Sequence, residues 1–390
     1  MNAAYDVVIA GAGLVGLSLA PALSRTGLSV ALIDRGSMAD REHAADTFDA
    51  RIYAISPGSA AFLRAVGAWQ ALRGERIAAI ESMHVEGDGG GSLDFSAYDL
   101  GERALAWIVE ERELRSALLQ TARRAGVQMI GEATLDALTW SAAAGTLRLT
   151  DGRTLEARLI VGADGARSWV REAAGIVAEP KSYGQTAVVA NFACERAHHG
   201  RAYQWFRADG GVLAWLPLPG RRMSMVWSAP DALAQTLLAE DADALSGRVA
   251  EAGGYALGTL SCITPPTGFP LRFLRLPTSV ALRLALVGDA AHGVHPLAGQ
   301  GVNLGFGDAQ SLSTVLAERG PVNDPGAPIL LERYARRRAE PVLAMQAVTD
   351  GLARLFGPPT PWLKALRNAG ISAVDRLPFL KRALAQPALR

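Results

Sequence analysis

The chain has 390 residues, of which 49% are hydrophobic and 20% are charged, and its 39 Lys and Arg residues against 38 Asp and Glu residues give a net charge of +1. This composition excludes a disordered chain, and the balanced charge excludes a strongly basic nucleic-acid-binding protein. The length favours two or three domains, or one large discontinuous unit.

The cysteine content and the hydropathy of the chain exclude further classes of protein. Only Cys194 and Cys262 occur, which excludes a disulfide scaffold and a cysteine-rich metal site. The longest apolar run, residues 7–23, follows Asp6 rather than a basic leader, and three glycines interrupt it. A signal peptide needs a basic leader, and a spanning helix needs about 20 apolar residues. We therefore expect a folded strand–turn–helix in a cytoplasmic protein.

The N-terminal segment has the pattern of a βαβ unit. Residues 5–10 predict a buried parallel strand, residues 14–24 a helix, and residues 28–33 a second strand. A G-x-G-x-x-G motif joins the first strand to the helix, and an acidic residue ends the second strand. This arrangement is typical of dinucleotide binding, and a purely structural turn is the alternative.

Each residue of the motif has a physical role in such a site. Gly11 permits the tight turn, Gly13 lets a pyrophosphate approach the backbone, and Gly16 allows close helix–strand packing. Asp34 can accept hydrogen bonds from ribose hydroxyls. Pro21 lies inside the predicted helix and is expected to kink it.

A second acidic turn follows the next predicted strands. Residues 114–126 predict a helix, and residues 146–150 and 154–161 predict strands. The later strand leads into Gly-Ala-Asp-Gly, so Asp164 and Gly165 stand at the carboxyl end of a strand, where open α/β sheets bind ligands. An Asp-Gly turn that caps the following helix is the alternative.

From residue 183 to about residue 270 the pattern changes to short strand-like runs, with helical periodicity only near residues 231–252. This predicts an antiparallel sheet domain inserted into the first domain. Its large aromatic residues either line a pocket for an aromatic ring or form the core of the sheet. The pocket candidates are Trp205, Phe206, Trp215 and Trp227.

A further strand at residues 284–287 leads into Gly288 and Asp289 and then into a glycine-rich loop. A helix is expected from the loop to about residue 316. Asp289 stands where a ribityl or ribose hydroxyl could be held. The first amides of the helix, near Gly301, would point at an anion or at an electron-rich ring edge.

Three residues of this loop are candidates for chemistry: His292, His295 and Pro296. Loop packing is the alternative for the histidines. They are three positions apart with no third ligand nearby, so we expect no metal site.

Several stretches together resemble a known family. Residues 286–305 contain Gly-Asp-Ala-Ala-His and His-Pro-Leu-Ala-Gly-Gln-Gly, and further similar stretches are residues 49–56, 183–187, 205–206, 216–218 and 348–356. The chain resembles the FAD-dependent aromatic hydroxylases, and among them the ubiquinone-biosynthesis hydroxylase family, from residue 5 to about residue 356.

The resemblance implies a fold like that of para-hydroxybenzoate hydroxylase. It consists of a discontinuous, Rossmann-like α/β FAD-binding domain, an inserted antiparallel β-sheet substrate domain and a helical C-terminal tail. The expected boundaries are residues 1–70, 100–180 and 271–345 for the FAD-binding domain, 71–99 and 181–270 for the sheet domain, and 346–390 for the tail.

The resemblance also implies site residues. The expected FAD contacts are Gly11, Gly13, Gly16, Asp34, Arg51, Asp164, Gly165, Gly288, Asp289, Gly301, Val302 and Asn303. Leu216 joins the four aromatic residues as a substrate-pocket candidate. Many relatives carry Arg, Gln or Asn at the position of Glu111, so this residue departs from the family pattern.

The activity implied is hydroxylation of the aromatic ring of a polyprenylated phenol in ubiquinone biosynthesis. FAD, NAD(P)H and O2 would act through a flavin C(4a)-hydroperoxide. One alternative is a related FAD-dependent oxidoreductase or monooxygenase acting on a soluble aromatic or isoprenoid substrate. Another is a non-catalytic flavin-binding member of a biosynthetic complex.

The expected partners are a membrane-embedded polyprenyl phenol, a ubiquinone-biosynthesis complex and a second copy of the chain, with no nucleic acid. Residues 351–390 carry seven basic residues and one acidic residue among apolar ones. This pattern predicts either attachment to anionic lipid or a helix packed on the FAD-binding domain. The expected location is the cytoplasm, with peripheral membrane attachment as the further expectation.

Overall fold

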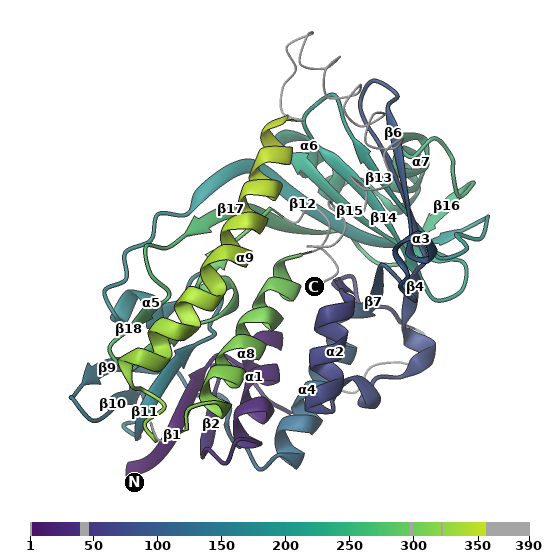
Figure 1. The fold of residues 1–390 in the computed structure, drawn as a ribbon. Helices are drawn as coiled ribbons and strands as arrows, with labels where there is room; N and C mark the ends of the chain where they lie inside the picture. Colours follow the sequence, from purple (N-terminus) through teal and green to yellow (C-terminus); the bar gives the residue numbers. More distant parts are fainter. Residues whose placement is uncertain (1, 40–46, 296–299, 321–322, 356–390) are drawn as a thin grey trace.

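The computed structural model describes residues 2–39, 47–295, 300–320 and 323–355. Figure 1 shows two sheets, one near the N-terminus and one above it, with helices grouped below the second sheet. The mixed α/β class, the Rossmann-like unit and the inserted antiparallel sheet predicted from the sequence are confirmed.

The first sheet has a parallel centre in the order β19-β11-β1-β2-β8. An antiparallel hairpin extends it beside β11, and a short antiparallel strand pairs with β19. The strands are β1 (Asn2–Ala10), β2 (Val30–Ile33), β8 (Gln128–Ile130), β9 (Leu135–Trp140), β10 (Gly145–Leu149), β11 (Thr154–Gly162), β18 (Val280–Ala281) and β19 (Leu284–Leu286).

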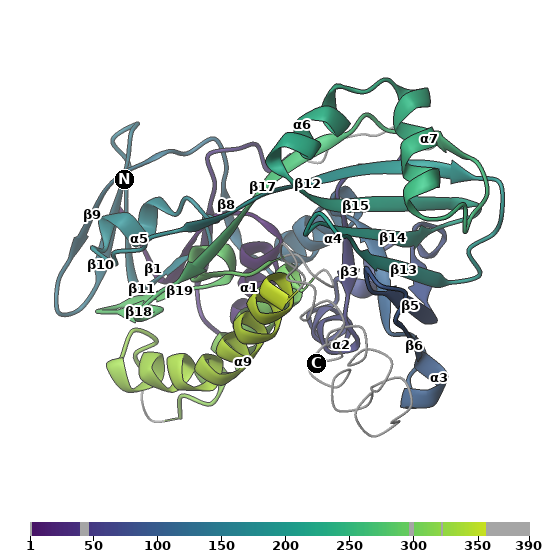
Figure 2. The ribbon, with the colours of Figure 1, turned by 90° about the horizontal axis from the view of Figure 1, so that it is seen from above.

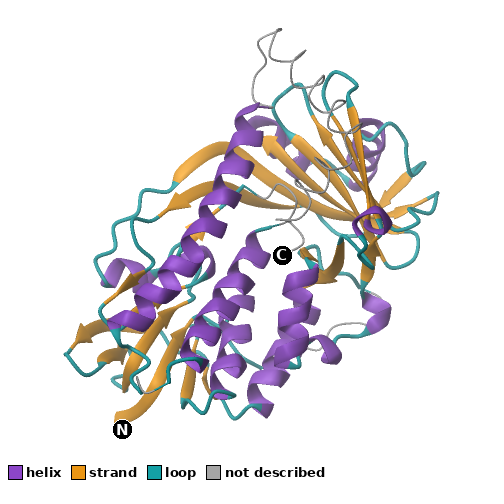
Figure 3. Cartoon of the chain, viewed as in Figure 1, coloured by secondary structure: helices purple, strands orange, loops and turns teal. Residues whose placement is uncertain are grey.

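Both faces of this sheet are covered, which is why its central strands are apolar on both sides. Helices cover one of the two faces. In Figure 3 these helices lie side by side below the second sheet. They are α1 (Leu14–Ser24), α2 (Pro57–Val66), α4 (Glu111–Arg124) and α8 (Gly301–Ala317). The opposite face packs against the β9–β10 hairpin and α5 (Trp169–Ala173). Helix α1 continues to its end through Pro21, and α4 begins three residues before the expected position.

The second sheet has the order β20-β17-β12-β15-β14-β13-β5-β6, with β16 beside β12. Its strands are β5 (Ser82–Glu86), β6 (Ser92–Ser96), β12 (Lys181–Cys194), β13 (Arg201–Phe206), β14 (Val212–Leu218), β15 (Arg222–Pro230), β16 (Leu260–Cys262), β17 (Thr267–Arg275) and β20 (His292–Gly293). Figure 2 shows α6 (Asp231–Ala239) and α7 (Ala242–Ala252) over one face, with α9 (Pro328–Leu355) toward the other.

A small antiparallel sheet joins the two larger units. It consists of β3 (Ile52–Ile55), β7 (Ala106–Glu110) and β4 (Ala78–Ile80), in the order β3-β7-β4. Its side chains pack with residues of the second sheet, including Ala202 and Leu218. A one-turn helix, α3 (Ala97–Leu100), follows β6.

Helix α9 (Pro328–Leu355) runs past both sheets (Figure 1). The Tyr334 hydroxyl donates to the Leu286 carbonyl of β19 at 2.8 Å, and Gln346 Nε2 donates to the Leu274 carbonyl of β17 at 2.8 Å. The helix is therefore bonded to both. It is continuous across residue 345, where the sequence places a domain boundary, and the boundaries stay predictions. No helix in the described ranges is long and apolar enough to cross a membrane.

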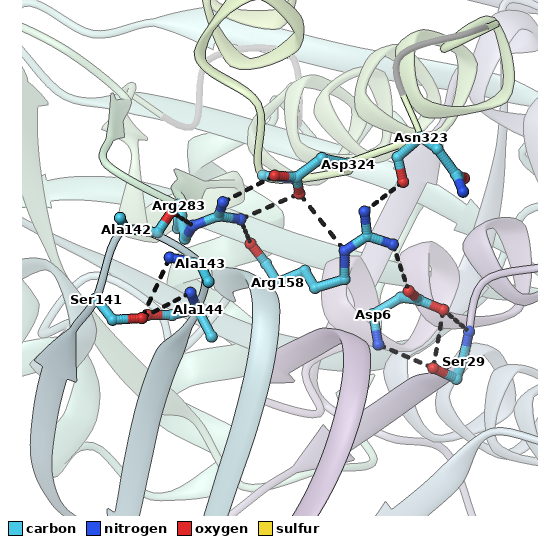
Figure 4. A network of polar contacts seen from close by, with 11 residues as sticks. Asp6, Ser29, Ser141, Ala142, Ala143, Ala144, Arg158, Arg283, Asn323 and Asp324 are labelled. Atoms are coloured by element: carbon cyan, nitrogen blue, oxygen red, sulfur yellow. Dashed lines mark hydrogen bonds and ion pairs between the residues drawn. The ribbon is translucent and has the colours of Figure 1, made fainter.

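A polar network joins the edge of the first sheet to the segment before α9 (Figure 4). Arg283 Nη2 donates to Asp324 Oδ2 at 2.8 Å, and Arg158 Nε lies 3.6 Å from Asp324 Oδ1. Arg158 Nη1 also contacts Asp6 Oδ1 at 3.2 Å, and the Ser29 hydroxyl donates to Asp6 Oδ2 at 2.9 Å. Five segments that are separate in the sequence, around Asp6, Ser29, Arg158, Arg283 and Asp324, are held together here.

Candidate functional site

A cavity of about 2350 Å³ lies between the first and second sheets. Pockets for drug-sized ligands measure roughly 300–1,000 Å³, so this cavity has room for two ligands in contact. One side is formed by the carboxyl ends of β1, β2 and β11 and by the start of α8. The other side is formed by one face of the second sheet.

The glycine turn shapes the first side of this cavity. Gly11 has a φ of +110°, and a Cβ there would stand 2.3 Å from the Ala163 carbonyl oxygen. A Cβ on Gly16 would stand 2.0 Å from the Gly11 carbonyl oxygen. At Gly13, by contrast, no atom lies within 4 Å of the Cβ position. Two glycines thus serve backbone packing, and Gly13 leaves space for a group that approaches the helix start.

The cavity brings together eleven of the twelve expected FAD contacts. Gly16 lies behind the turn, where it packs against Gly11. The residues on the cavity wall are Gly11, Gly13, Asp34, Arg51, Asp164, Gly165, Gly288, Asp289, Gly301, Val302 and Asn303.

Asp34 fastens the end of β2 to the glycine turn. Its Oδ2 accepts from Ala12 N at 2.6 Å, and its Oδ1 accepts from Gly36 N at 2.7 Å. A carboxylate oxygen can accept more than one hydrogen bond, so the residue can also hold a ribose hydroxyl.

Arg115 is a wall residue that the sequence analysis missed. Its Nη1 donates to the Ala12 carbonyl oxygen at 2.5 Å, and its Nη2 donates to the Ser37 carbonyl oxygen at 3.1 Å. The available signal was its spacing of four residues from Glu111, which places both side chains on one face of α4.

Charged groups of both signs face each other in the cavity. Arg51 Nε lies 3.0 Å from Glu111 Oε2, and its guanidinium lies over the rings of Tyr53 and Phe269 at 5.6 and 5.3 Å. Burial works against the charge of Arg51, but Tyr53 and Glu111 raise the pKa of the guanidinium. The Asp289 side chain is accessible from the cavity, and protein atoms surround it on its other sides. Burial raises the pKa of this carboxyl, against an opposing effect of nearby cationic groups.

Asp164 helps to hold the start of the next helix, as the structural alternative predicted, and its role toward a cofactor stays a prediction. Its Oδ1 accepts from the Ser168 hydroxyl at 2.5 Å, and its Oδ2 accepts from Val170 N at 3.0 Å. These bonds hold the start of α5. The residue also lines the cavity, beside Gly165.

The start of α8 presents its backbone to the cavity. The Asn303 side chain is directed away from a ligand role, because its Nδ2 donates to the Ala54 carbonyl at 2.8 Å and its Oδ1 accepts from Ser56 N at 3.0 Å. These bonds tie α8 to the junction of β3 and α2. The N-terminal end of the helix, at Gly301 and Val302, therefore faces the cavity with its positive dipole.

The two candidate histidines lie off the cavity wall. His292 Nε2 donates to Asp308 Oδ2 at 2.6 Å, and His295 Nε2 donates to Gln185 Oε1 at 3.0 Å. Both are buried, and burial lowers the pKa of His295 to about 4. These contacts favour loop packing over catalysis. Pro296 lies outside the described residues.

The aromatic-pocket prediction is wrong for three of its four aromatic members. Phe206 and Leu216 line the cavity, whereas Trp205, Trp215 and Trp227 belong to the cluster that packs against α6 and α7. Successive side chains of a strand point to opposite faces. Trp205 precedes Phe206 and Trp215 precedes Leu216, so each pair is divided between the two faces.

The second sheet gives the cavity an apolar wall. Strands β5 and β6, which the sequence analysis did not single out as pocket elements, supply much of it, and alternating apolar residues in both strands were the available signal. This wall includes Met83, Val85, Leu93, Phe95, Val226 and Leu271. It continues to Met345 and Leu352 of α9. Among the described residues, no group of three His, Cys, Asp or Glu side chains could hold a metal ion.

The parallel sheet with its glycine turn, the acidic residues at its strand ends and the cavity beside them define a dinucleotide-binding α/β protein. A model of the FAD-binding domain family matches residues 4–349. The chain belongs to this family, and FAD is its cofactor.

Relatives agree with this assignment over the full chain. The chain is 39% identical to the ubiquinone hydroxylase UbiL of Rhodospirillum rubrum, covering 98% of this chain and 89% of that protein. It is 33% identical to the 3-demethoxyubiquinol 3-hydroxylase of Escherichia coli, covering 100% and 99%. The crystal structure of PqsL of Pseudomonas aeruginosa with 2-aminobenzoylacetate superposes with a TM-score of 0.79 at 26% identity, covering 94% and 99%. The chain is an FAD-dependent oxidoreductase of this hydroxylase class.

Proposed function

We propose that this chain hydroxylates the aromatic ring of a polyprenylated phenol in ubiquinone biosynthesis, with NAD(P)H and O2 as co-substrates. The observation that carries the proposal is the cavity, which passes from the glycine turn to the apolar wall of the second sheet. Two relatives whose names refer to ubiquinone metabolism match almost the whole chain.

The residues of the chain have definite tasks in this reaction. Bound FAD supplies the redox chemistry, which transfers electrons from NAD(P)H to O2. The amides at Gly301 and Val302 stabilise negative charge that develops beside them. The apolar wall excludes water. One oxygen atom enters a ring C–H bond, the other leaves as water, and NAD(P)H supplies two electrons.

The apolar wall favours a substrate with a hydrocarbon chain over a soluble phenol. Phe206 and Leu216 stand where an aromatic ring can pack, and the wall continues along β5 and β6 to α9. Burial of each methylene group contributes about 0.8 kcal/mol. A polyprenyl group therefore gains binding free energy that a soluble aromatic substrate lacks.

A polyprenyl phenol resides in a lipid bilayer, so we also propose peripheral membrane attachment. The basic and apolar residues of the segment 356–390, which lies outside the described residues, are the proposed attachment point. Cosedimentation with anionic vesicles, but not with neutral ones, is the expected result. The homo-oligomer and the biosynthetic complex stay predictions.

The test of the activity uses the FAD-loaded protein, NADPH and ¹⁸O2. A farnesylated phenol is the substrate, and the same phenol without its prenyl group is the control. We expect one ¹⁸O atom in the prenylated product and much slower oxidation of NADPH with the control. Equal turnover of both phenols would favour the soluble-substrate alternative. A protein that binds FAD but hydroxylates neither would favour the non-catalytic alternative.

A further inference from the structure

Asp308 lies behind the cofactor turn, on α8, and its side chain is 1% exposed. Its Oδ2 accepts hydrogen bonds from Gly288 N at 2.8 Å and from His292 Nε2 at 2.6 Å. Its Oδ1 accepts from Arg338 Nε at 2.6 Å. One carboxylate therefore binds the turn after β19, strand β20 and helix α9.

The carboxylate is ionised, which makes its hydrogen bonds strong. Burial by itself raises the pKa of Asp308, but His292 and Arg338 hold it below its usual value. Arg338 makes a second contact with α8, because its Nη2 donates to the Leu304 carbonyl at 3.0 Å. The charge pair thus lies where α8 and α9 meet, and Arg338 also lines the cavity.

The Gly288 contact reaches the cofactor site directly. Gly288 has a φ of +60°, and the next side chain, Asp289, is open to the cavity. A Cβ on Gly288 would stand 3.2 Å from Val15 Cγ2, and one on Gly305 would stand 2.5 Å from the same atom. The turn is therefore packed closely against α1 and α8. An anchored N–H at Gly288 consequently fixes the direction of Asp289.

We propose that Asp308 is a positioning residue for FAD, which fixes the Gly288–Asp289 turn and pairs with Arg338, a residue lining the cavity that would hold the flavin. Reduction adds negative charge to the cofactor. Removal of the Asp308 charge therefore raises the reduction potential, and removal of the Arg338 charge lowers it. The proposal concerns FAD binding and does not depend on which ring is hydroxylated.

The experiment compares Asp308→Asn, Arg338→Met and Arg338→Lys with the natural chain. The Kd of the apoprotein for FAD is measured by quenching of flavin fluorescence, and the potential of bound FAD by dye-coupled reduction. Asp324→Asn is the matched control, because it removes an arginine-paired carboxylate that does not line the cavity. We expect Asp308→Asn to weaken FAD binding by about tenfold, as expected for the loss of one charge-assisted hydrogen bond, and to raise the potential. Arg338→Met lowers the potential, and Arg338→Lys restores it.

Asp308→Asn and Arg338→Met are expected to shift the reduction potential of bound FAD in opposite directions. General destabilisation of the fold would not produce shifts of opposite sign, so the two variants separate positioning from destabilisation. Equal effects of Asp308→Asn and Asp324→Asn on FAD binding would overturn the proposal. If Asp308→Asn does not fold, the Arg338 pair decides. A potential unchanged in Arg338→Met then overturns the proposal, and a lowered potential restored by Arg338→Lys supports it.

Discussion

Arg51 and Glu111 form an ion pair in the wall of the cofactor cavity, with Nε and Oε2 3.0 Å apart. Glu111 is the first residue of α4, and its N–H also donates to the Arg51 carbonyl at 3.0 Å. Main chain and side chain thus join the segment before β3 to the start of α4. Glu111, which the family resemblance marks as a departure, is thus the partner of Arg51.

Glu111→Gln is expected to tighten FAD binding. The substitution removes a negative charge from a cavity that takes an anionic pyrophosphate. The pair is partly exposed, with side chains 49% and 29% accessible, so the effect is small. We expect a gain of roughly 0.6 kcal/mol, or about threefold in Kd, and a loss of similar size in Arg51→Met. FAD titration of both apoproteins checks this, and weaker binding in both variants would contradict it.

Gly13→Ala and Gly16→Ala are expected to separate cofactor binding from folding. The Cβ at residue 13 meets no atom within 4 Å and projects toward the ligand, so the apoprotein keeps its stability and loses FAD affinity. The Cβ at residue 16 meets a backbone oxygen at 2.0 Å, and such overpacking costs about 1–3 kcal/mol of stability. Thermal unfolding of the apoproteins and FAD titration are the measurements. A destabilised Gly13→Ala apoprotein would contradict the assignment of open space.

His295 is expected to make stability depend on pH. Burial lowers its pKa from 6.5 to about 4, so the unfolded chain takes up a proton below pH 6.5 while the folded protein does not. This contribution to stability is complete above pH 6.5 and is lost as the pH falls toward 4, by about 2 kcal/mol at pH 5. We expect the Tm of His295→Gln to fall less than that of the natural chain between pH 7 and pH 5. Identical slopes would refute the assignment.

Adjacent residues of β13 are expected to respond differently to substitution. Phe206 faces the cavity, whereas Trp205 packs on the other face and stacks on Tyr203 at 5.5 Å between ring centres. Phe206→Ala therefore raises the KM for the aromatic substrate by about tenfold, from roughly 1.5 kcal/mol of lost contact. Trp205→Leu lowers the Tm and leaves KM unchanged. Steady-state kinetics and thermal unfolding test this prediction. A raised KM in Trp205→Leu would contradict the assignment of Trp205 to the face away from the cavity.

Asp324→Ala is expected to lower stability without a change in FAD affinity. The residue accepts two hydrogen bonds from Arg283, whose side chain is 9% exposed (Figure 4). Loss of these bonds leaves a buried guanidinium without its carboxylate, at a cost of about 2 kcal/mol. Urea unfolding of the apoprotein measures the cost. A large loss of FAD affinity would show that this edge network reaches the cavity.

Local patterns were sufficient to predict the βαβ unit and the second sheet. The run of residues 5–10 is apolar because β1 is covered on both faces, and the short strand-like runs after residue 183 form the antiparallel strands β12 to β15. The spacing of the glycines predicted the phosphate-binding turn, because a positive φ or a close approach of two backbone segments is needed at fixed positions of such a turn. These signals lie within a few residues of one another, so they can be recognised in the sequence without knowledge of the tertiary structure.

The sequence could not decide which way a strand's side chains face, or what holds a buried polar group. Trp215 and Leu216 have the same hydrophobic character, and only the packing of α6 and α7 assigns Trp215 to the far side. His292 reads as a candidate for catalysis until Asp308, from another element, is seen to bind it.

The sequence by itself therefore determined the α/β class and the inserted sheet, because local spacing encodes them, and the family resemblance supplied the glycine and aspartate positions that are expected to hold FAD. The tertiary structure decided the Arg51–Glu111 pair, the role of Arg115 and the Asp308 contacts with Gly288 and Arg338. Such contacts join residues far apart in the chain, and their free energy depends on distance and burial that only the packed fold sets.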